Sequence, residues 1–332
     1  MNFLDTVLSL AAVNLLSPPV LFFALGFAGT LAGSQLTLPE AVAKTLSIYL
    51  MLAIGFKGGA ALSKEGMSAA LLLAILSGIF LSALIPLVAF AILRAVSKLP
   101  RVDAAAVAGH YGSISIVTFV ASTQALQFAG LQQEGFMVAV AAAMETPAIL
   151  VALWLANRGR ERKTPEDQSR GQLMHEVMLN SSVVVLLGAF AIGALTGERG
   201  LTEVSGFIVA PFTGVLCLFL LDMGAVAGRG MKQGRDVLDA RLIGFALLMP
   251  LLGAVIALPF AWASGLSAGG AALLLTLAAS ASYIAVPAAM RLALPEARPS
   301  VYLTLSLGVT FPVNLTLGIP AYAAAGRWIA GV

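Results

Sequence analysis

The chain has 332 residues, of which 59% are hydrophobic and only 11% are charged. Soluble domains carry about 25% charged residues, so this composition excludes an ordinary soluble protein and indicates a polytopic membrane protein. The 19 Lys and Arg residues are spread over short hydrophilic gaps without a basic stripe, which argues against nucleic acid as a partner. The single cysteine, Cys217, excludes a disulfide framework within one chain.

Apolar segments of roughly 20 residues, the length needed to cross a bilayer, recur along the chain. The ten expected spans are residues 18–35, 39–57, 67–93, 102–129, 134–156, 177–196, 205–228, 241–264, 268–292 and 299–326. The residues before the first span lack the basic region of a signal peptide, and we expect them to form a short interfacial helix. An even number of spans places both termini on the same side of the membrane.

Positive charge sets the expected orientation, because Lys and Arg favour cytoplasmic loops. With both termini outside, fifteen of the 19 Lys and Arg residues fall in inner loops. We therefore expect a multi-pass protein of the cytoplasmic (inner) membrane, surrounded by lipid, with external N- and C-termini. Lys57, next to Gly58 and Gly59, is expected to mark the end of the second span and to extend toward the interface.

A polar segment, residues 158–176, divides the chain near its middle and is predicted to be a cytoplasmic linker. Residues 1–157 and 177–332 then hold five spans each, which requires the two halves to have opposite orientations. Three pairs of stretches resemble each other in the same order: 15–33 and 179–197, 51–59 and 220–228, and 144–154 and 309–319. The predicted fold class is therefore all-α, with ten transmembrane helices arranged as two inverted five-helix repeats.

The fourth and ninth spans are interrupted by polar and helix-breaking residues. The fourth is rich in Gly, Ser and Thr over residues 108–122, and the ninth carries Ser280, Ser282 and Pro287. Such a backbone is tolerated at membrane depth only where it faces protein or a wet cavity. Interrupted helices at matching places in two repeats, crossing near the membrane centre, are typical of a transporter binding site.

A helix broken in the membrane exposes N–H groups at its new N-terminus, and these favour an anion. The other half-helix ends in carbonyl groups that suit a cation such as Na⁺. The residues expected around a small anion are Gly112, Ser113, Ser115, Thr118, Ser280 and Ser282. Close helix packing is the alternative role for these residues, since small hydroxyl side chains are common at helix contacts in membranes.

Ionisable residues inside spans are costly and therefore indicate function. Glu145, two residues before Pro147, is a candidate Na⁺ ligand or proton carrier; a structural hydrogen bond or a pair with a neighbouring helix is the alternative. Asp222 is a candidate coupling residue for Na⁺; the alternatives are that it reaches the membrane interface or pairs with Arg229. His110 opens the first interruption, where it contacts substrate, carries a proton, or packs as a buried histidine.

Thr310 and Asn314 flank Pro312 in the tenth span and are candidate neutral ligands for Na⁺. The sequence contains no G-x-x-x-x-G-K-[ST] phosphate loop, no H-E-x-x-H and no paired Cys motif. We therefore expect neither an enzyme nor an ATP-driven pump, and no cofactor other than Na⁺ as the coupling ion.

The chain resembles the sodium-dependent bicarbonate transporter family known from cyanobacteria along nearly its whole length. The stretches that carry the resemblance are residues 17–42, 50–62 (LMLAIGFKGGAAL), 102–115, 144–157 (METPAILVALWLAN) and 278–302. The resemblance implies ten spans as five plus five, a homotrimer and Na⁺-coupled bicarbonate uptake. It also implies a PII-like regulator at the cytoplasmic face, although the short central linker argues against one.

The interruptions depart from the family pattern. In the fourth span Ser115 and Thr118 match its hydroxyl positions, but Ile116 and Val117 stand between them. In the ninth span Tyr283 stands where the family carries an acidic residue, and we include Tyr283 among the substrate-contacting candidates. Glu145, in contrast, matches an acidic position of the family.

The sequence thus predicts a secondary transporter for Na⁺-coupled symport of a small anion, with bicarbonate as the expected substrate. One alternative is a H⁺-coupled carrier of a small organic acid or neutral solute, in which Glu145 or Asp222 carries the proton. Because Tyr283 replaces the acidic residue that would help to bind Na⁺, the ninth span favours this alternative. A third possibility is a membrane sensor of the same fold that does not transport.

Overall fold

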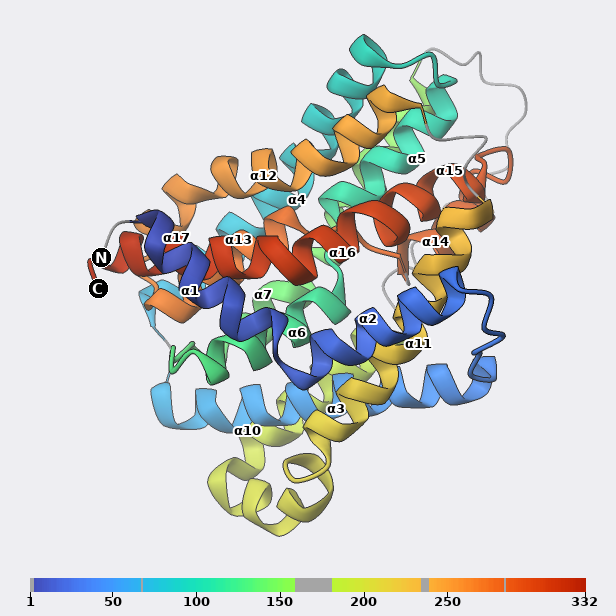
Figure 1. Cartoon of the computed structure of the whole chain (residues 1–332). Helices are drawn as coiled ribbons and strands as arrows, with labels where there is room; N and C mark the ends of the chain where they lie inside the picture. Colours follow the sequence, from blue (N-terminus) through green and yellow to red (C-terminus); the bar gives the residue numbers. More distant parts are fainter. Residues whose placement is uncertain (1–2, 67, 159–180, 234–238, 284) are drawn as a thin grey trace.

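The structure, a computed structural model, describes residues 3–66, 68–158, 181–233, 239–283 and 285–332 (Figure 1). Every regular element in these ranges is a helix. Within them, eight helical segments are long and apolar enough to cross a membrane, and a bent pair of shorter helices would make a ninth. The chain is therefore a multi-pass helical membrane protein, as its composition predicts.

The helices follow the chain order of the expected spans, but the eight or nine segments long enough to cross a membrane do not confirm the expected number of ten. Those of the first half are α1 (Phe3–Leu15), α2 (Pro18–Leu31), α3 (Glu40–Glu65), α4 (Ala69–Val96), α5 (Arg101–Gly112), α6 (Ile116–Phe128), α7 (Met137–Ala143) and α8 (Glu145–Asn157). Those of the second half are α10 (Ser181–Ile208), α11 (Phe212–Gln233), α12 (Ala240–Ala263), α13 (Ala268–Ala279), α14 (Ala285–Ala293), α15 (Pro299–Leu303), α16 (Phe311–Val313) and α17 (Ile319–Ala330), with π-helical turns η1 (Thr304–Thr310) and η2 (Asn314–Gly318).

Several helix ends differ from the predicted ones. α3 continues to Glu65, so the prediction that Lys57 marks the end of a span is wrong; the ammonium group lies over the Phe212 ring, which accommodates it within the helix bundle. α10 continues past the predicted end of the sixth span, and it kinks at Gly197, which adopts a φ of 60°. The predicted linker lies outside the described residues except for Arg158.

The first predicted span is also short. α2 has 14 residues, which rise only about 21 Å, and it is bent by 68° from α1. By length and composition the bent pair is either a broken span or a re-entrant loop. The short N-terminal helix that the sequence predicts is therefore present, as α1. It packs along α17, and its Asn14 amide donates to the Leu315 carbonyl of η2 at 2.7 Å.

Glycines bring α2 and α11 into direct backbone contact. A Cβ atom added to Gly26 would lie 2.0 Å from the carbonyl oxygen of Leu221, and one added to Gly224 would lie 2.1 Å from that of Phe23. No side chain fits at such distances. The two helices therefore approach as closely as their backbones permit, which is the usual role of small residues between membrane helices.

The pair α3 and α10 repeats this arrangement. A Cβ atom on Gly59 would lie 1.9 Å from the Phe190 carbonyl oxygen, and one on Gly193 would lie 2.2 Å from that of Phe56. Figure 1 shows α2, α3, α10 and α11 together on one side of the molecule. We call these four helices the glycine-packed group.

The remaining long helices form a second group around the two interruptions. In it α4 packs on α5 and α8, α12 packs on α13, and α4 and α12 also contact each other. The helix pairs α5 with α8 and α13 with α17 complete the group. Figure 1 shows α4, α5 and α12 on the side opposite to α3 and α10, with α6, α13 and α16 between them. The interruptions thus lie inside the molecule.

Candidate functional site

The first interruption separates α5, which ends at Gly112, from α6, which begins at Ile116. Ser115 caps α6, because its Oγ accepts a hydrogen bond from the Thr118 amide at 3.2 Å. The Ile116 and Val117 amides also belong to the first turn, and neither has an acceptor among the described residues. Two backbone N–H groups are therefore left facing the interruption.

The second interruption follows α13, which ends at Ala279, and contains Ser280, Ser282 and Tyr283. The Asn314 amide donates to the Ala279 carbonyl at 2.8 Å, and so satisfies one acceptor that the end of the helix exposes. The Ser280 hydroxyl donates to the Leu277 carbonyl at 2.9 Å. The end of α13 is thus bonded by side chains from both its own segment and the last span.

The two interruptions cross and hydrogen-bond to each other. The Ser115 amide donates to Ser280 Oγ at 2.9 Å, and the Ser282 amide donates to the His110 carbonyl at 2.7 Å. Each broken segment therefore supplies an acceptor for a backbone amide of the other. The structure brings together residues that lie about half the chain apart, as the sequence predicts for a site between two broken helices.

Three buried polar atoms of the interrupted segments have no hydrogen-bond partner among the described residues. They are His110 Nε2, Ser113 Oγ and the Tyr283 hydroxyl oxygen. His110 Nδ1 lies 2.7 Å from the Ala106 carbonyl, so the proton is assigned to Nδ1 and Nε2 is an acceptor. The His110 ring stacks on that of Tyr302, with centroids 4.4 Å apart. Because buried polar atoms are nearly always bonded, each of the three atoms is a candidate contact for a polar ligand or water.

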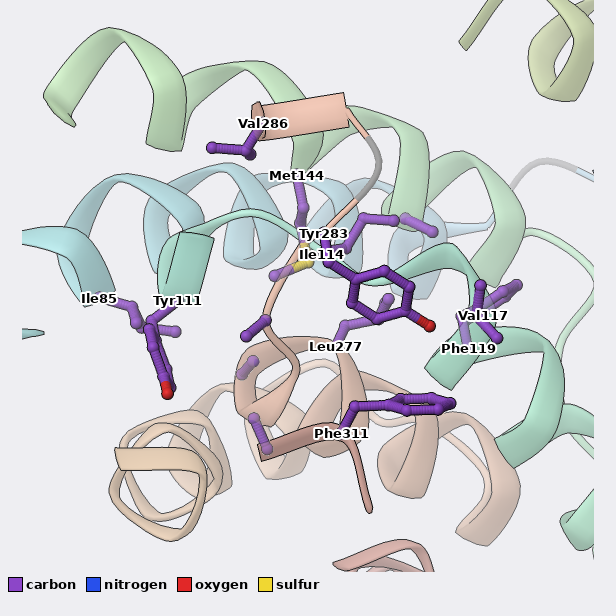
Figure 2. Packing of buried hydrophobic residues seen from close by; sticks show 14 of the residues in the cluster. Ile85, Tyr111, Ile114, Val117, Phe119, Met144, Leu277, Tyr283, Val286 and Phe311 are labelled. Carbon is purple, nitrogen blue, oxygen red and sulfur yellow. The ribbon is translucent and has the colours of Figure 1, made fainter. Parts of the chain in front are cut away.

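Tyr283 is buried in the second interruption. Its ring packs edge-on against Phe311, with centroids 5.3 Å apart, and Figure 2 shows it beside Ile114 with its hydroxyl directed toward Val117 and Phe119. The hydroxyl faces the Ser115 side chain without forming a hydrogen bond of normal geometry. A tyrosine here offers a neutral donor, whereas an acidic residue would offer a charged cation ligand.

Helix register places Glu145 level with the first interruption. A Cβ atom on Gly109 would lie 2.7 Å from that of Ala152, and one on Gly112 would lie 3.0 Å from that of Ala148, so α5 and α8 run antiparallel. Glu145 is three residues before Ala148 and therefore on the same face of α8. Its side chain is buried and has no ion-pair partner among the described residues.

The two neutral Na⁺ candidates lie close to the crossing but already have partners. Thr310 Oγ1 donates to the Ala246 carbonyl at 2.7 Å and lies 2.7 Å from the Tyr111 hydroxyl. The Asn314 side-chain oxygen accepts from the Tyr322 hydroxyl at 2.8 Å. A cation at these residues would share oxygens that the fold already uses.

Asp222 is not brought to the crossing by any described contact. Its carboxylate accepts from the Leu38 amide at 3.2 Å, in the loop between α2 and α3. Arg229 donates to the Leu36 carbonyl of the same loop at 2.8 Å and does not pair with Asp222 among the described contacts. Both residues therefore hold this loop against α11.

Sequence reasoning missed several polar residues that complete the site. Tyr111 bonds Thr310, Thr276 lies 3.2 Å from the Ser122 hydroxyl, and Ser82 bonds the Met144 carbonyl and the Ala148 amide. The Ser82 hydroxyl thus bonds backbone groups at the break between α7 and α8 and in the first turn of α8. Pro147 signals that such a gap exists, but nothing in the sequence indicates which distant hydroxyl fills it.

An all-helical, multi-pass chain with two interrupted helices crossing at its centre is typical of membrane transport proteins. The family comparison agrees with this class. The chain belongs to the Na⁺-dependent bicarbonate transporter superfamily, whose family model matches residues 18–327. This membership confirms the resemblance found in the sequence and implies a transporter of small anions in a membrane, not an enzyme. No curated protein matches the chain.

Proposed function

We propose that the protein carries bicarbonate and Na⁺ together across the membrane by alternating access around the two crossed interruptions. The observation that carries this proposal is that five polar groups of the two interrupted segments have no hydrogen-bond partner among the described residues: the three buried side-chain atoms and the Ile116 and Val117 amides. A small anion with both acceptor oxygens and one hydroxyl complements this set.

Bicarbonate fits these groups by its chemistry. Its charged oxygens accept from the Ile116 and Val117 amides, from the Ser113 hydroxyl and from the Tyr283 hydroxyl. Its hydroxyl donates to His110 Nε2, the atom that the bond to Ala106 leaves as an acceptor. An anion without a hydroxyl leaves this nitrogen unpaired. The remaining residues of the proposed site are Gly112, Thr118, Ser280 and Ser282.

Na⁺ would be held between Glu145 and the oxygens of the last span. Glu145 supplies the negative charge, and Thr310 and Asn314 supply neutral oxygens, which are the ligand types that a hard cation prefers. Register places Glu145 beside the interruption, while Asn314 already contacts the end of α13. Asp222 stays outside this proposed set because its carboxylate is held at the loop between α2 and α3.

The proposed architecture is ten spans in two inverted five-helix repeats, residues 1–157 and 177–332. The repeated sequence stretches support it. Gly55 and Gly224, which correspond to each other in the aligned stretches, face the backbone carbonyls of Leu186 and Phe23 in the partner helix. The pairs α3 with α10 and α11 with α2 are thus exchanged by the proposed pseudo-symmetry.

The fifteen Lys and Arg residues of the expected inner loops support an inner-membrane protein with both termini outside. Family membership supports a homotrimer as the working assembly. Mass measurement of the purified protein in detergent would test the trimer. Labelling of single cysteines placed at the two termini would test the orientation.

Uptake into proteoliposomes tests the function directly. We expect labelled bicarbonate to accumulate when Na⁺ is higher outside, and equal accumulation with and without external Na⁺ would refute the proposed coupling. Uptake driven by a pH gradient alone would instead indicate a H⁺-coupled carrier. Thermal stabilisation by bicarbonate without any flux would indicate a sensor.

A matched pair of serine variants tests the site. Ser113→Ala removes an unpaired hydroxyl at the crossing and should weaken bicarbonate binding about tenfold, the effect of about 1.4 kcal/mol. Ser63→Ala removes a hydroxyl on α3 that bonds the Ala60 carbonyl of its own helix, and it should leave binding unchanged. Equal affinities in the two variants would contradict the proposed site.

A further inference from the structure

We propose that Lys57, together with the start of α11, forms a second binding site for a small monovalent anion, on the path between the α6–α7 end of the bundle and the crossed interruptions. The proposal rests on the proposed function in one respect: the anion that this site collects is the transported one. The site itself is argued below from its own contacts.

Lys57 is a cation inside a helix bundle. Its neighbours on α3 face other helices: Gly55 and Gly59 contact α10, and Gly58 contacts Val138 of α7. Lys57 points to α11, where its ammonium nitrogen lies 3.7 Å from the centroid of the Phe212 ring. No carboxylate among the described residues pairs with it. The ring attracts the cation but carries no compensating charge.

The start of α11 adds a second positive feature at the same place. Phe212 is the first residue of this 22-residue helix, and its first turn contains no acidic residue. The Val215 amide donates to the Pro211 carbonyl, while the Thr213 and Gly214 amides have no acceptor among the described residues. The ammonium and the positive end of the helix repel each other, and both favour an anion between them.

Some other charges and helix ends among the described residues have hydrogen-bond partners within the protein. Glu134 accepts from the Ser267 amide at 2.6 Å and from its hydroxyl at 3.0 Å, so a carboxylate covers the start of α13. Arg229 and Lys232 donate to backbone carbonyls at 2.8 Å. Lys57 and the start of α11 lack such a partner within the described chain, which points to a mobile anion as their partner.

The contacts of Thr213 connect this place to the transport site. Thr213 Oγ1 donates to Gln124 Oε1 on α6 at 3.3 Å. Gln124 lies nine residues after Ser115, the cap of α6, or about 13 Å along the helix. An anion at Lys57 would therefore lie at the far end of α6 from the crossing. The role of the site is to raise the local concentration of the anion before it reaches the crossing.

Substitution of Lys57 tests whether this residue affects the binding of the anion, measured by KM, without affecting the transport rate, measured by kcat. We expect Lys57→Gln to raise KM for bicarbonate about 3- to 10-fold at low ionic strength while kcat stays within twofold. The difference from wild type should shrink at about 1 M salt, where charges are screened over roughly 3 Å. Lys57→Arg keeps the charge and should retain the wild-type KM.

Lys64→Gln is the matched control. Lys64 lies on the same helix two turns away, but it is exposed and paired with Glu198 at 2.9 Å, so its loss should leave KM unchanged. An unchanged KM in Lys57→Gln, or an equal rise in Lys64→Gln, would overturn the proposal.

Crystals of the wild-type protein grown in bromide give a readout that does not depend on transport. We expect an anomalous peak in contact with Lys57 Nζ that is absent from Lys57→Gln crystals. No peak in wild type overturns the site, and a peak combined with an unchanged KM identifies an adventitious ion only. If Lys57→Gln does not fold, the site is tested by the bromide peak in the wild-type crystals and by the KM of Lys57→Arg: no peak, or a raised KM, overturns it. If bromide binds but the protein moves no bicarbonate, the site stands and the proposed function fails.

Discussion

The glycine-packed helices and the crossed interruptions bring backbones together in opposite ways. In α3 and α10 the helices are continuous at their contact, and the glycine Cα atoms lie directly on carbonyl oxygens such as that of Phe190. At the crossing the helices are broken, and serine side chains bond the amides and carbonyls that the breaks expose. One contact excludes side chains, and the other depends on them.

The two kinds of contact differ because the surrounding hydrocarbon cannot hydrogen-bond to the backbone. In hydrocarbon a continuous helix satisfies its own backbone, so it approaches a neighbour most closely where it has no side chain. A broken helix cannot satisfy its backbone alone and requires hydroxyls or a ligand. We therefore expect the glycine-packed group to be sensitive to added volume, and the crossing to be sensitive to lost hydrogen bonds.

The largest effect is expected from added volume in the glycine-packed group. Gly59→Ala places a methyl group 1.9 Å from the Phe190 carbonyl oxygen, which should lower the free energy of unfolding by about 3 kcal/mol. Gly188→Ala on α10 is the control, because nothing lies within 4 Å of its added methyl group; it should stabilise the helix by up to about 1 kcal/mol. Thermal unfolding in detergent compares the two, and equal melting temperatures would refute the close packing.

At the crossing, Ser280→Ala should destabilise without adding volume. It leaves the buried Ser115 amide without an acceptor, at a cost of about 2 kcal/mol. Thr123→Val is the control on α6, since Thr123 donates only to the Phe119 carbonyl of its own helix. A loss as large in Thr123→Val would show that any lost hydroxyl in this region has the same effect.

Glu145→Gln tests the charge beside the interruption. We expect Na⁺-driven bicarbonate uptake to fall at least tenfold, equivalent to about 1.4 kcal/mol, because the amide cannot neutralise Na⁺. Glu203→Gln alters an exposed residue that pairs with Arg199 and should transport normally. Undiminished Na⁺-dependent uptake in Glu145→Gln would remove Glu145 from the proposed cation site.

The smallest effects compare one ion pair from each region. Asp103, with its side chain 4% exposed, accepts from the Arg298 amide and guanidinium at 2.7 to 2.8 Å. Asp103→Asn should cost about 1 kcal/mol in unfolding free energy, discounted because the Arg298 side chain is 52% exposed. Lys64→Gln breaks an exposed pair and should cost less than about 0.5 kcal/mol. A reversed order in chemical or thermal unfolding would contradict this ranking.

Much of the fold and part of the site were predictable from local sequence. The interruption between Gly112 and Ile116 follows from a run of Gly and Ser in an apolar segment, and Ser115 is a typical helix cap. The end of α3 was predicted wrongly at Lys57, because a single charge resembles a span boundary when the ring that receives it is unknown. Phe212, which provides that ring, is 155 residues away.

The sequence by itself determined the environment of this protein and the places where its helices break. Hydropathy and Gly, Ser and Pro content act over one or two helical turns, and a membrane leaves few structures that satisfy them. Only the tertiary structure decided which distant groups meet. Ser280 receives the Ser115 amide, and Glu145 lies level with the first interruption because α5 and α8 pack antiparallel. These contacts depend on helix register, which apolar patterns in a uniform hydrocarbon solvent do not specify.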